Sequence, residues 1–272
     1  MFRCLNPGAI GVSLPWDQCL PLAKKNGFEG IDVAIDPSAP AAAVTDALAK
    51  HGLKAGGTGL PVNLYGDEKA FNAALTNLGA IAARAAEIGV TRFATWILPF
   101  SDTLPLEDNF AWHAQRLSRA ARALDGHGCR LGLEFIGPKT LRMGHKYPFV
   151  RTMEQMLDLA EAVGPNAGLL LDSWHWYTSL GTVEDIEALQ PEQVVYVHIN
   201  DAPSGIAVDA QRDNVRRLPG ETGIIDLKGF LGALRKIGYD GPVVPEPFVP
   251  ELGTLPADEA IRRVGEALKR IW

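Results

Sequence analysis

The chain has 272 residues, of which 47% are hydrophobic and 21% are charged, and its formal net charge is -6. This composition is typical of a globular protein with a sizeable core, and the acidic balance argues against a protein that holds DNA by phosphate contacts, which usually has a basic excess. No apolar run approaches eighteen residues, and the N-terminus lacks a signal-peptide pattern. The three cysteines form no CxxC pair, which favours reduced thiols. We therefore expect a cytoplasmic protein with no nucleic-acid or membrane partner.

Short apolar runs alternate with segments of helical periodicity along the first half of the chain. Glycines at positions 27, 52, 89 and 126 end the helical segments, as glycine commonly does just beyond a helix C-terminus. The predicted strands occupy residues 1–12, 30–35, 53–60 and 90–98, and the predicted helices occupy residues 15–26, 40–50, 67–88 and 107–125.

The second half repeats this alternation, with two longer connections at residues 137–147 and 201–222. Its predicted strands occupy residues 130–136, 167–172, 194–200 and 243–245, and its predicted helices occupy residues 152–163, 183–189, 226–237 and 257–271. Eight strand–helix units at a mean spacing of roughly 34 residues predict a (β/α)8 TIM barrel of the α/β class, as a single domain over residues 1–272. Continuous apolar strands, buried on both faces, fit that fold. A doubly wound sheet is the alternative, and the lack of a GxGxxG loop after any strand disfavours it.

Four ionisable side chains fall at or near the ends of the last four predicted strands. They are Glu134 in CRLGLEFIG, Asp172 in AGLLLDSWH, His198 in VVYVHIND and Glu246 in VVPEPF. Prolines on both sides of Glu246 end its strand, because proline cannot donate to a sheet ladder. The carboxyl ends of barrel strands carry the active site, so we expect the four side chains to converge there.

Three carboxylates and an imidazole at one point would repel one another without a cation, which predicts a divalent metal site. Oxygen ligands with one nitrogen suit Mn²⁺, Mg²⁺ or Co²⁺, and the absence of a thiolate disfavours a closed structural zinc site. Each residue alone has a simpler interpretation, as a helix cap, a solvated charge or a hydrogen-bonded structural histidine. Their succession over four strands favours the metal. His51, His113 and His127 lie on helices or before strands, where we expect structural or solvated roles.

The segments GLEFIGP, LLLDSWHW, VHINDAP, RRLPGETGIIDLKGFLGALRKIGYDG and VVPEPF resemble the sugar phosphate isomerase/epimerase family of xylose isomerase-like TIM barrels. The resemblance covers residues 129–248 well, and the first half only by general pattern. It implies that Glu134, Asp172, His198 and Glu246 bind the metal, with Mn²⁺ as the expected ion and Mg²⁺, Co²⁺ or Zn²⁺ as alternatives.

The same resemblance implies roles in catalysis and in substrate binding. Glu134 and Glu246 would act as a general acid/base pair, His175 would lie near substrate oxygens, and Arg217 would contact the substrate, with Arg216 as the alternative register. A metal on adjacent carbonyl and hydroxyl oxygens acidifies the intervening C–H and stabilises an enediolate. The resemblance therefore predicts a divalent-metal-dependent isomerase or epimerase of a keto-sugar or sugar phosphate. The alternative is a dehydratase or lyase that eliminates a group from a keto-inositol or 3-keto-glycoside.

Loop residues and tryptophans are candidates to shape a sugar pocket. Lys139, Arg142 and His145 lie in the loop after the fifth predicted strand, from which they can reach a substrate. We expect about half of four tryptophans to stack on a sugar ring and the others to pack in the core. These are Trp16, Trp96, Trp174 and Trp176.

Two rival functions and the state of assembly stay open. The endonuclease IV branch of the same barrel shares the DSWH and HIND motifs but needs additional histidines early in the barrel and before the LPGE segment, and the chain has none there. The second rival is a non-catalytic sugar-binding barrel. Such a protein would not need metal-binding side chains at all four ligand positions, so their presence argues against it. The partner that we expect is a small-molecule sugar, and the sequence leaves open a homo-oligomer or a partner subunit.

Overall fold

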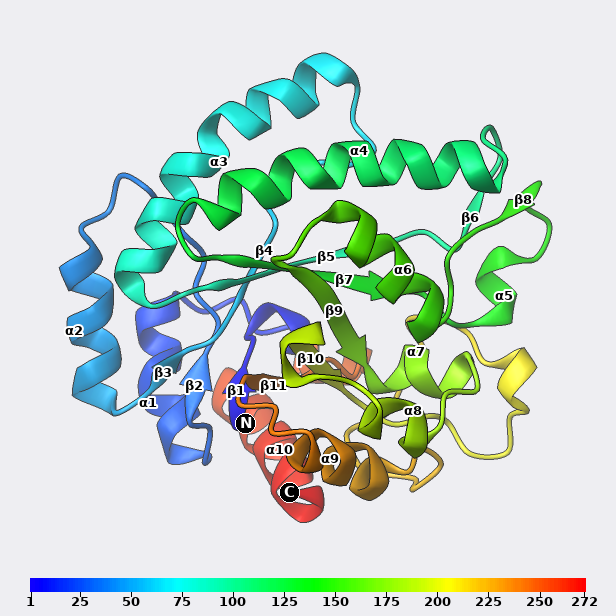
Figure 1. Cartoon of the computed structure of the whole chain (residues 1–272). Coiled ribbons are helices and arrows are strands. Elements are labelled where there is room, and N and C mark those ends of the chain that lie inside the picture. The colour runs from blue at the N-terminus through cyan, green and yellow to red at the C-terminus, as the bar shows by residue number, and fades with distance from the viewer.

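The computed structural model describes all 272 residues and has the TIM-barrel fold, with the sheet inside and helices around it (Figure 1). Every ladder of the main sheet is parallel. Its nine strands are β1 (Phe2–Leu5), β2 (Gly30–Ile31), β3 (Lys54–Ala55), β4 (Thr58–Gly59), β5 (Arg92–Ile97), β7 (Arg130–Phe135), β9 (Ala167–Asp172), β10 (Val194–Ile199) and β11 (Pro242–Pro245).

The sheet closes on itself through one glycine-containing segment. The strand order is β3-β2-β1-β11-β10-β9-β7-β5-β4, and its two ends, β3 and β4, are separated in sequence only by Gly56 and Gly57. A Cβ atom on Gly56 would collide with Asp32 and Cys4, and one on Gly57 would collide with the ring of Tyr196. The predicted strand at 53–60 is therefore two short strands, of which β3 pairs with β2 and β4 pairs with β5. Two glycines join them where side chains of the barrel interior leave no room for a Cβ atom.

The eight predicted helices are all present within a few residues of their expected ends. They are α1 (Trp16–Lys25), α2 (Ala41–His51), α3 (Glu68–Ile88), α4 (Leu106–Asp125), α6 (Met153–Val163), α8 (Val183–Glu187), α9 (Leu227–Lys236) and α10 (Ala257–Ile271). Gly52 and Gly89 follow α2 and α3 with left-handed φ angles of 58° and 88°. These are the conformations that glycine adopts without steric cost.

Several short elements were not expected from the sequence. Two short helices lie beyond strand ends, α5 (Lys139–Arg142) three intervening residues after β7 and α7 (Ser173–Thr178) directly after β9. Strand β6 (Phe100–Ser101) pairs antiparallel with β8 (Tyr147–Pro148). Single turns of 3-10 helix are η1 (Gly8–Ile10), η2 (Pro191–Gln193), η3 (Val208–Ala210) and η4 (Pro250–Thr254). The predicted strand at 30–35 pairs only over its first two residues. These elements lie largely in the loops where periodicity gives no signal.

The apolar side chains fall into two groups that follow the two faces of the barrel sheet. A cluster of 59 buried residues lies between the sheet and the surrounding helices. A separate cluster of five fills the barrel interior, and it consists of Phe2, Cys4, Leu170, Tyr196 and Val244. All three cysteines are buried free thiols, as the sequence predicts.

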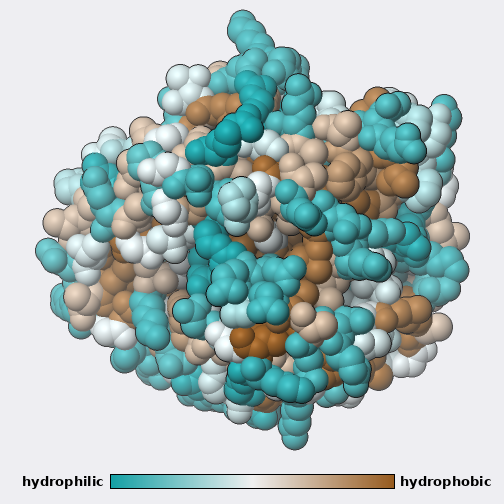
Figure 2. Space-filling model, viewed as in Figure 1, coloured by the Kyte–Doolittle hydropathy of each residue, from teal (hydrophilic) through white to brown (hydrophobic).

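None of the helices is long and apolar enough to cross a membrane. Figure 2 shows hydrophilic and hydrophobic side chains intermixed over the visible face of the molecule.

His113 on α4 is a buried structural histidine, as its place in the sequence predicts. Its side chain is 2% exposed. Nδ1 lies 2.9 Å from the carbonyl oxygen of Asn109, and Nε2 lies 3.4 Å from the hydroxyl of Tyr65. Burial lowers the pKa of His113 to about 4, because the charged ring would lose its hydration.

Acidification should therefore destabilise the protein through His113. The unfolded chain binds a proton with the ordinary histidine pKa of 6.5, whereas the folded chain resists protonation until about pH 4. This stabilisation is complete above pH 6.5 and falls as the pH drops to 4, by up to about 3 kcal/mol. Urea unfolding of the metal-free protein at a series of pH values measures it. His113→Gln should have a shallower pH dependence than the wild type, and the exposed His127→Gln should keep the wild-type slope. An unchanged slope in His113→Gln would refute this assignment.

Candidate metal centre

The four predicted ligands occupy inward-facing positions of four strands that are adjacent in the barrel. Side chains alternate between the two faces of a strand, and Leu170, Tyr196 and Val244 point into the interior. Two residues beyond them, on the same face, come Asp172, His198 and Glu246, while Glu134 lies two residues beyond Gly132 on β7. The strand register places His198 beside Asp172. The apolar interior layer is thus followed, towards the carboxyl ends of the strands, by an ionisable layer.

The ligand atoms of this layer lie within 4.8 Å of one another. Nδ1 of His198 is 3.3 Å from a carboxylate oxygen of Glu134, 3.3 Å from one of Glu246 and 3.9 Å from one of Asp172. Three of the four residues are buried, and the side chain of Glu246 is 18% exposed. Three carboxylates and one imidazole at this spacing fit a divalent cation. The group can therefore hold a metal ion, with Glu246 at the side open to a substrate.

Proximity and burial shift the protonation of these groups in different directions. Burial raises the pKa of Glu134 to about 7, with His198 opposing the shift. Burial also opposes ionisation of Asp172, but the charges of Arg216, His175 and His198 together outweigh it and lower the pKa of Asp172 to about 2. Burial opposes ionisation of Glu246 too, but the charge and hydrogen bond of His198, together with the Arg216 charge, hold the pKa of Glu246 below its ordinary value. The pKa of His198 rises well above its usual range, because Glu246 and Glu134 outweigh the desolvation of its ring. The carboxylates of the site therefore differ in proton affinity.

The arginine that reaches this cluster is Arg216, and Arg217 points elsewhere. The Arg216 side chain is 2% exposed, and its Nη1 lies 2.8 Å from Asp172 and 3.1 Å from Glu246. Its Nη2 lies 3.0 Å from Asp213, and its buried Nε has no hydrogen-bond acceptor in the chain. Arg217 is 42% exposed and pairs loosely with Glu221 at 3.8 Å.

A backbone bridge beyond β10 sets this register. The N–H of Arg217 donates to the carbonyl of Asp201 at 2.8 Å, and the N–H of Asp201 donates to the carbonyl of Arg217 at 2.9 Å. Because neighbouring residues of an extended segment point to opposite sides, Arg216 faces the cluster when Arg217 pairs in this way. The sequence pattern RRLPGE contains no signal for that bridge, which is why its register could not be predicted.

The two arginines should differ sharply in their contribution to stability. Arg216→Gln removes a buried cation from between Asp172 and Glu246 and leaves their charges uncompensated, so we expect the metal-free protein to lose about 3–5 kcal/mol. Arg217→Gln changes an exposed group and should cost less than about 0.5 kcal/mol. Urea unfolding in the presence of a chelator measures both. Equal losses in the two variants would contradict the register described above.

Of the other predicted substrate-binding residues, only His175 lies beside the cluster, whereas Lys139 and His145 do not. His175 on α7 is buried, its Nδ1 accepts the N–H of Gly137 at 3.2 Å, and burial lowers its pKa to about 4. Its Nε2 lies 3.2 Å from Nη2 of Arg216. Lys139 instead pairs with Asp209 at 2.6 Å, and His145 pairs with Asp102 at 2.9 Å. Neither lines a cavity next to the cluster.

Two cavities meet at the ligand cluster. One, of about 150 Å³, is lined away from the other cavity by Asn6, Asp32 and Thr58, and we call it the β-side cavity. The other, of about 400 Å³, is lined by Leu98, Ile136, Leu141, His175, Arg216 and Phe248, and we call it the loop-side cavity. Glu134, Glu246 and Trp96 line both. A substrate that spans the two cavities would thus pass directly beside both glutamates.

The tryptophans divide as the sequence suggests, with two near the cavities and two in the core. Trp96 is 50% exposed and lines both cavities. Trp16 lines a recess of about 270 Å³ that continues from the β-side cavity and shares Asn6, Asp32 and Thr58 with it. Trp174 and Trp176 are buried.

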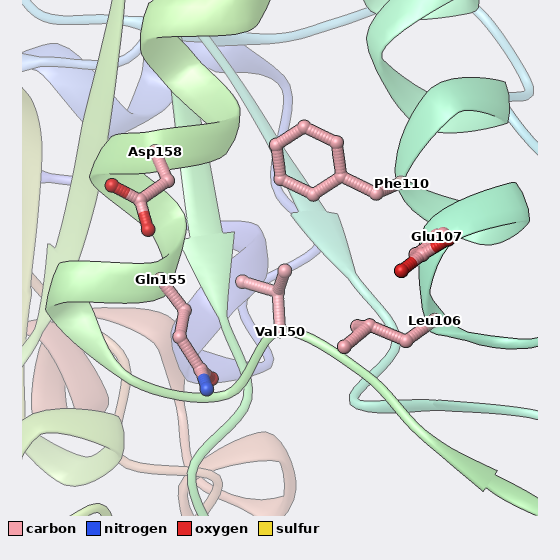
Figure 3. A pocket seen from close by; sticks show the side chains of 6 residues that line it. All are labelled: Leu106, Glu107, Phe110, Val150, Gln155 and Asp158. Carbon is pink, nitrogen blue, oxygen red and sulfur yellow. The ribbon is translucent and has the colours of Figure 1, made fainter.

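A further cavity lies away from the site, between α4 and α6 on the outside of the barrel. It has a volume of about 460 Å³ and is lined by Leu106, Phe110, Val150 and polar side chains. Figure 3 shows these side chains facing one another across the gap between the two helices. No ligand of the cluster lines it.

Sequence reasoning missed Asp32, which lines the β-side cavity just beyond β2. The signal was a carboxylate next to Ile31 in the apolar run GIDVAI, at a strand end like those of the four ligands. Tyr196 was missed too, because an aromatic residue within an apolar strand cannot be distinguished from ordinary core.

A family model described as a xylose isomerase-like TIM barrel matches residues 20–271. Among curated proteins, an inosose isomerase of Bacillus velezensis is 28% identical over 209 residues, which are 75% of this chain and 70% of that protein. A 3-dehydroshikimate dehydratase of Pseudomonas aeruginosa is 37% identical over 116 residues, which are 42% of this chain and 18% of that protein.

Solved structures give the same picture of the fold. A xylose isomerase domain protein from Alicyclobacillus acidocaldarius superposes with a TM-score of 0.87 at 34% identity, over 100% of this chain and 98% of that one. A structure of the IolI protein with a bound zinc atom superposes with a TM-score of 0.81 at 23% identity, over 100% of this chain and 98% of that one.

Proposed function

The chain belongs to the xylose isomerase-like TIM barrel family, and from this premise we propose that it is a divalent-metal-dependent enzyme that isomerises or epimerises a keto-sugar. The observation that carries the proposal is the arrangement of the ligand cluster. Glu134 and Glu246 are ligand candidates that also line both adjoining cavities, so a substrate in either cavity meets two carboxylates. The relative named an inosose isomerase supports a polyhydroxy ketone as the substrate.

The metal would be held by Glu134, Asp172, His198 and Glu246, and we propose Mn²⁺ because oxygen donors predominate among them. When bound, the cation supplies positive charge that acidifies the C–H beside a ketone. One glutamate removes that proton, and the other returns it to the same or the neighbouring carbon. The position and face of its return decide between isomerisation and epimerisation.

The surrounding side chains would orient the substrate for this transfer. The ring of His175 and the guanidinium of Arg216 line the loop-side cavity. The Nε–H of Arg216 has no acceptor in the chain, which is rare for a buried donor in a folded protein. Trp96 offers an aromatic face at the junction of the two cavities. We therefore propose His175 and Arg216, in place of Arg217, as the substrate contacts.

A metal-dependent dehydratase is the second candidate, favoured by the likeness to the 3-dehydroshikimate dehydratase. The same proton abstraction expels a leaving group if the substrate carries one β to the carbanion. Product analysis separates this outcome from isomerisation, because elimination releases water or an alcohol.

Deuterium exchange tests the proposal. The protein is freed of metal, reloaded with Mn²⁺, Mg²⁺, Co²⁺ or Zn²⁺, and incubated in D₂O with ketoses, keto-inositols and 3-keto-glycosides. We expect metal-dependent deuterium incorporation beside the carbonyl of at least one compound, seen by NMR. An absence of exchange and of product with every metal and compound would refute an enzyme of this class.

A further inference from the structure

Asp32 is held rigidly as a hydrogen-bond acceptor at the wall of the β-side cavity. Its Oδ1 accepts the N–H of Gly57 at 2.8 Å and the thiol of Cys4 at 3.5 Å. Its Oδ2 accepts the hydroxyl of Tyr196. An ionised carboxylate offers about four lone-pair positions, so three donors fix its orientation and leave one position for a further donor. All three partners are donors, and none of them is a Lys or Arg side chain.

The wall around Asp32 suits hydroxyl groups. Asn6, Asp32 and Thr58 line both the β-side cavity and the recess that contains Trp16. The indole N–H of Trp16 donates to the backbone carbonyl of Asp32 at 2.9 Å, which fixes the ring beside the carboxylate. Polar side chains next to an aromatic face are the combination that binds sugar rings, because the hydroxyls find hydrogen bonds and the C–H faces find an apolar surface.

The same region is unfavourable for an anion. No Lys or Arg side chain lines the β-side cavity or the Trp16 recess. The one guanidinium beside the cluster, Arg216, is already compensated by three carboxylates at 2.8, 3.0 and 3.1 Å. A phosphate placed near Asp32 would lose hydration and face a like charge, and no Lys or Arg side chain is there to offset either cost. Arg212 lies apart, in a recess with Thr140, Met143 and Asn214 beside the loop-side cavity.

We propose that Asp32 is a specificity-determining residue that accepts a hydrogen bond from a hydroxyl of an uncharged polyhydroxy ketone and excludes the phosphorylated form. This inference rests on the proposed function, since it concerns the part of the substrate remote from the reacting carbon. Asp32 fixes the orientation of the polyol in the β-side cavity, and Glu134 and Glu246 act at the other end. Asp32 would thus distinguish neutral keto-sugars from sugar phosphates, both of which are compatible with the metal chemistry.

Paired substrates with and without a phosphate test the proposal. The pair is D-fructose and D-fructose 6-phosphate. The ketone that exchanges fastest in the deuterium experiment is measured beside them as a second neutral substrate. We expect the Mn²⁺-loaded wild type to exchange the neutral ketones with a kcat/KM at least about 100-fold above the phosphate. Asp32→Asn should raise KM for the neutral ketones about 10-fold or more, the loss typical of a hydrogen bond to a charged group, with kcat changed less than threefold. Asp32→Asn should also reduce the ratio of kcat/KM for the neutral ketone to kcat/KM for the phosphorylated one.

Two control variants keep the outcome interpretable. Thr58→Val removes a hydroxyl from the same wall without touching the Asp32 contacts, and it should raise KM in the same direction. Arg212→Gln should change neither compound's kinetics. The proposal is overturned if the phosphate is the better substrate, if its use depends on Arg212, or if both Asp32→Asn and Thr58→Val keep the wild-type KM.

Binding measured without turnover separates this inference from the proposed function. Quenching of tryptophan fluorescence reports occupancy, because Trp16 and Trp96 line the cavities. We expect the metal-loaded protein to bind D-fructose at least about 10-fold more tightly than D-fructose 6-phosphate, and Asp32→Asn to weaken only the former. If the binding is as expected but no deuterium exchange occurs, the proposed enzymatic activity is refuted and the role of Asp32 in specificity stands. If exchange occurs but D-fructose 6-phosphate binds more tightly, the enzymatic activity stands and the role of Asp32 is refuted.

Discussion

Glu246→Gln should lower the rate of metal-dependent deuterium exchange by at least about 10³-fold. A glutamine has nearly the same shape but cannot accept a proton at neutral pH, and general acid/base groups contribute about 10²–10⁴-fold. Glu246 is the ligand with the most exposed side chain and lines both cavities, so loss of the proton acceptor should dominate over any change of shape. Glu134→Gln should have an effect of the same order, because the proton needs a second carboxylate to return.

The metal content of Glu246→Gln distinguishes loss of a proton acceptor from loss of the metal as the cause of the lower exchange rate. The amide oxygen that replaces the carboxylate in Glu246→Gln can still contact a cation, so we expect this variant to retain at least half of the wild-type metal at saturating Mn²⁺, measured by elemental analysis. Glu251→Gln, on the exposed η4 turn five residues away, is the matched control and should keep full activity. If Glu246→Gln binds metal normally and still exchanges at the wild-type rate, Glu246 is not an acid or base.

His198→Ala should abolish stoichiometric metal binding, and this is the second large effect. The imidazole is the only nitrogen donor of the group and lies between all three carboxylates. Losses of 10–100-fold in affinity are typical of residues that merely support a ligand, so removal of a ligand itself should exceed about 100-fold. Titration calorimetry with Mn²⁺ on the chelator-treated protein measures the affinity directly.

Thermal unfolding offers an independent measurement of the same event. A ligand that binds only the folded state stabilises it by about 2.7 kcal/mol at 100 times its Kd. Mn²⁺ should therefore raise the Tm of the wild type and of the exposed-histidine control His127→Ala, but not that of His198→Ala. Undiminished metal content in both His198→Ala and Glu246→Gln would eliminate this group of residues as the metal site.

The barrel and the ligand group were accessible from the sequence because both depend on local regularities. Apolar runs of strand length alternate with helices that end at glycine, as at Gly52 and Gly89, and eight repeats of that unit leave few folds. The convergence of the four predicted ligand residues follows from strand polarity, since parallel strands deliver their last inward-facing residues to one end of the barrel. Glu134, Asp172 and His198 obey this rule within two residues of a strand end.

The remaining features depend on contacts between distant segments. The register of Arg216 is set by a bridge between Asp201 and Arg217. Gly57 packs too closely on Tyr196, more than a hundred residues away, for any side chain to fit there. Lys139 and His145 are held by Asp209 and Asp102 on other loops. Periodicity and residue type do not encode such pairings, so loop residues could be proposed from the sequence but not positioned.

The guanidinium of Arg216 has a consequence for the order in which the protein is assembled. Small zinc-binding modules stay unfolded until their ion arrives, because the ion is the principal force that holds their ligands together. Here a covalently attached cation already lies between Asp172 and Glu246, and a core of 59 buried residues surrounds the barrel sheet. The barrel therefore has sources of stability that do not depend on a metal ion. We expect the metal-free chain to be folded, and an ion bound at the proposed site to be exchangeable without unfolding the barrel.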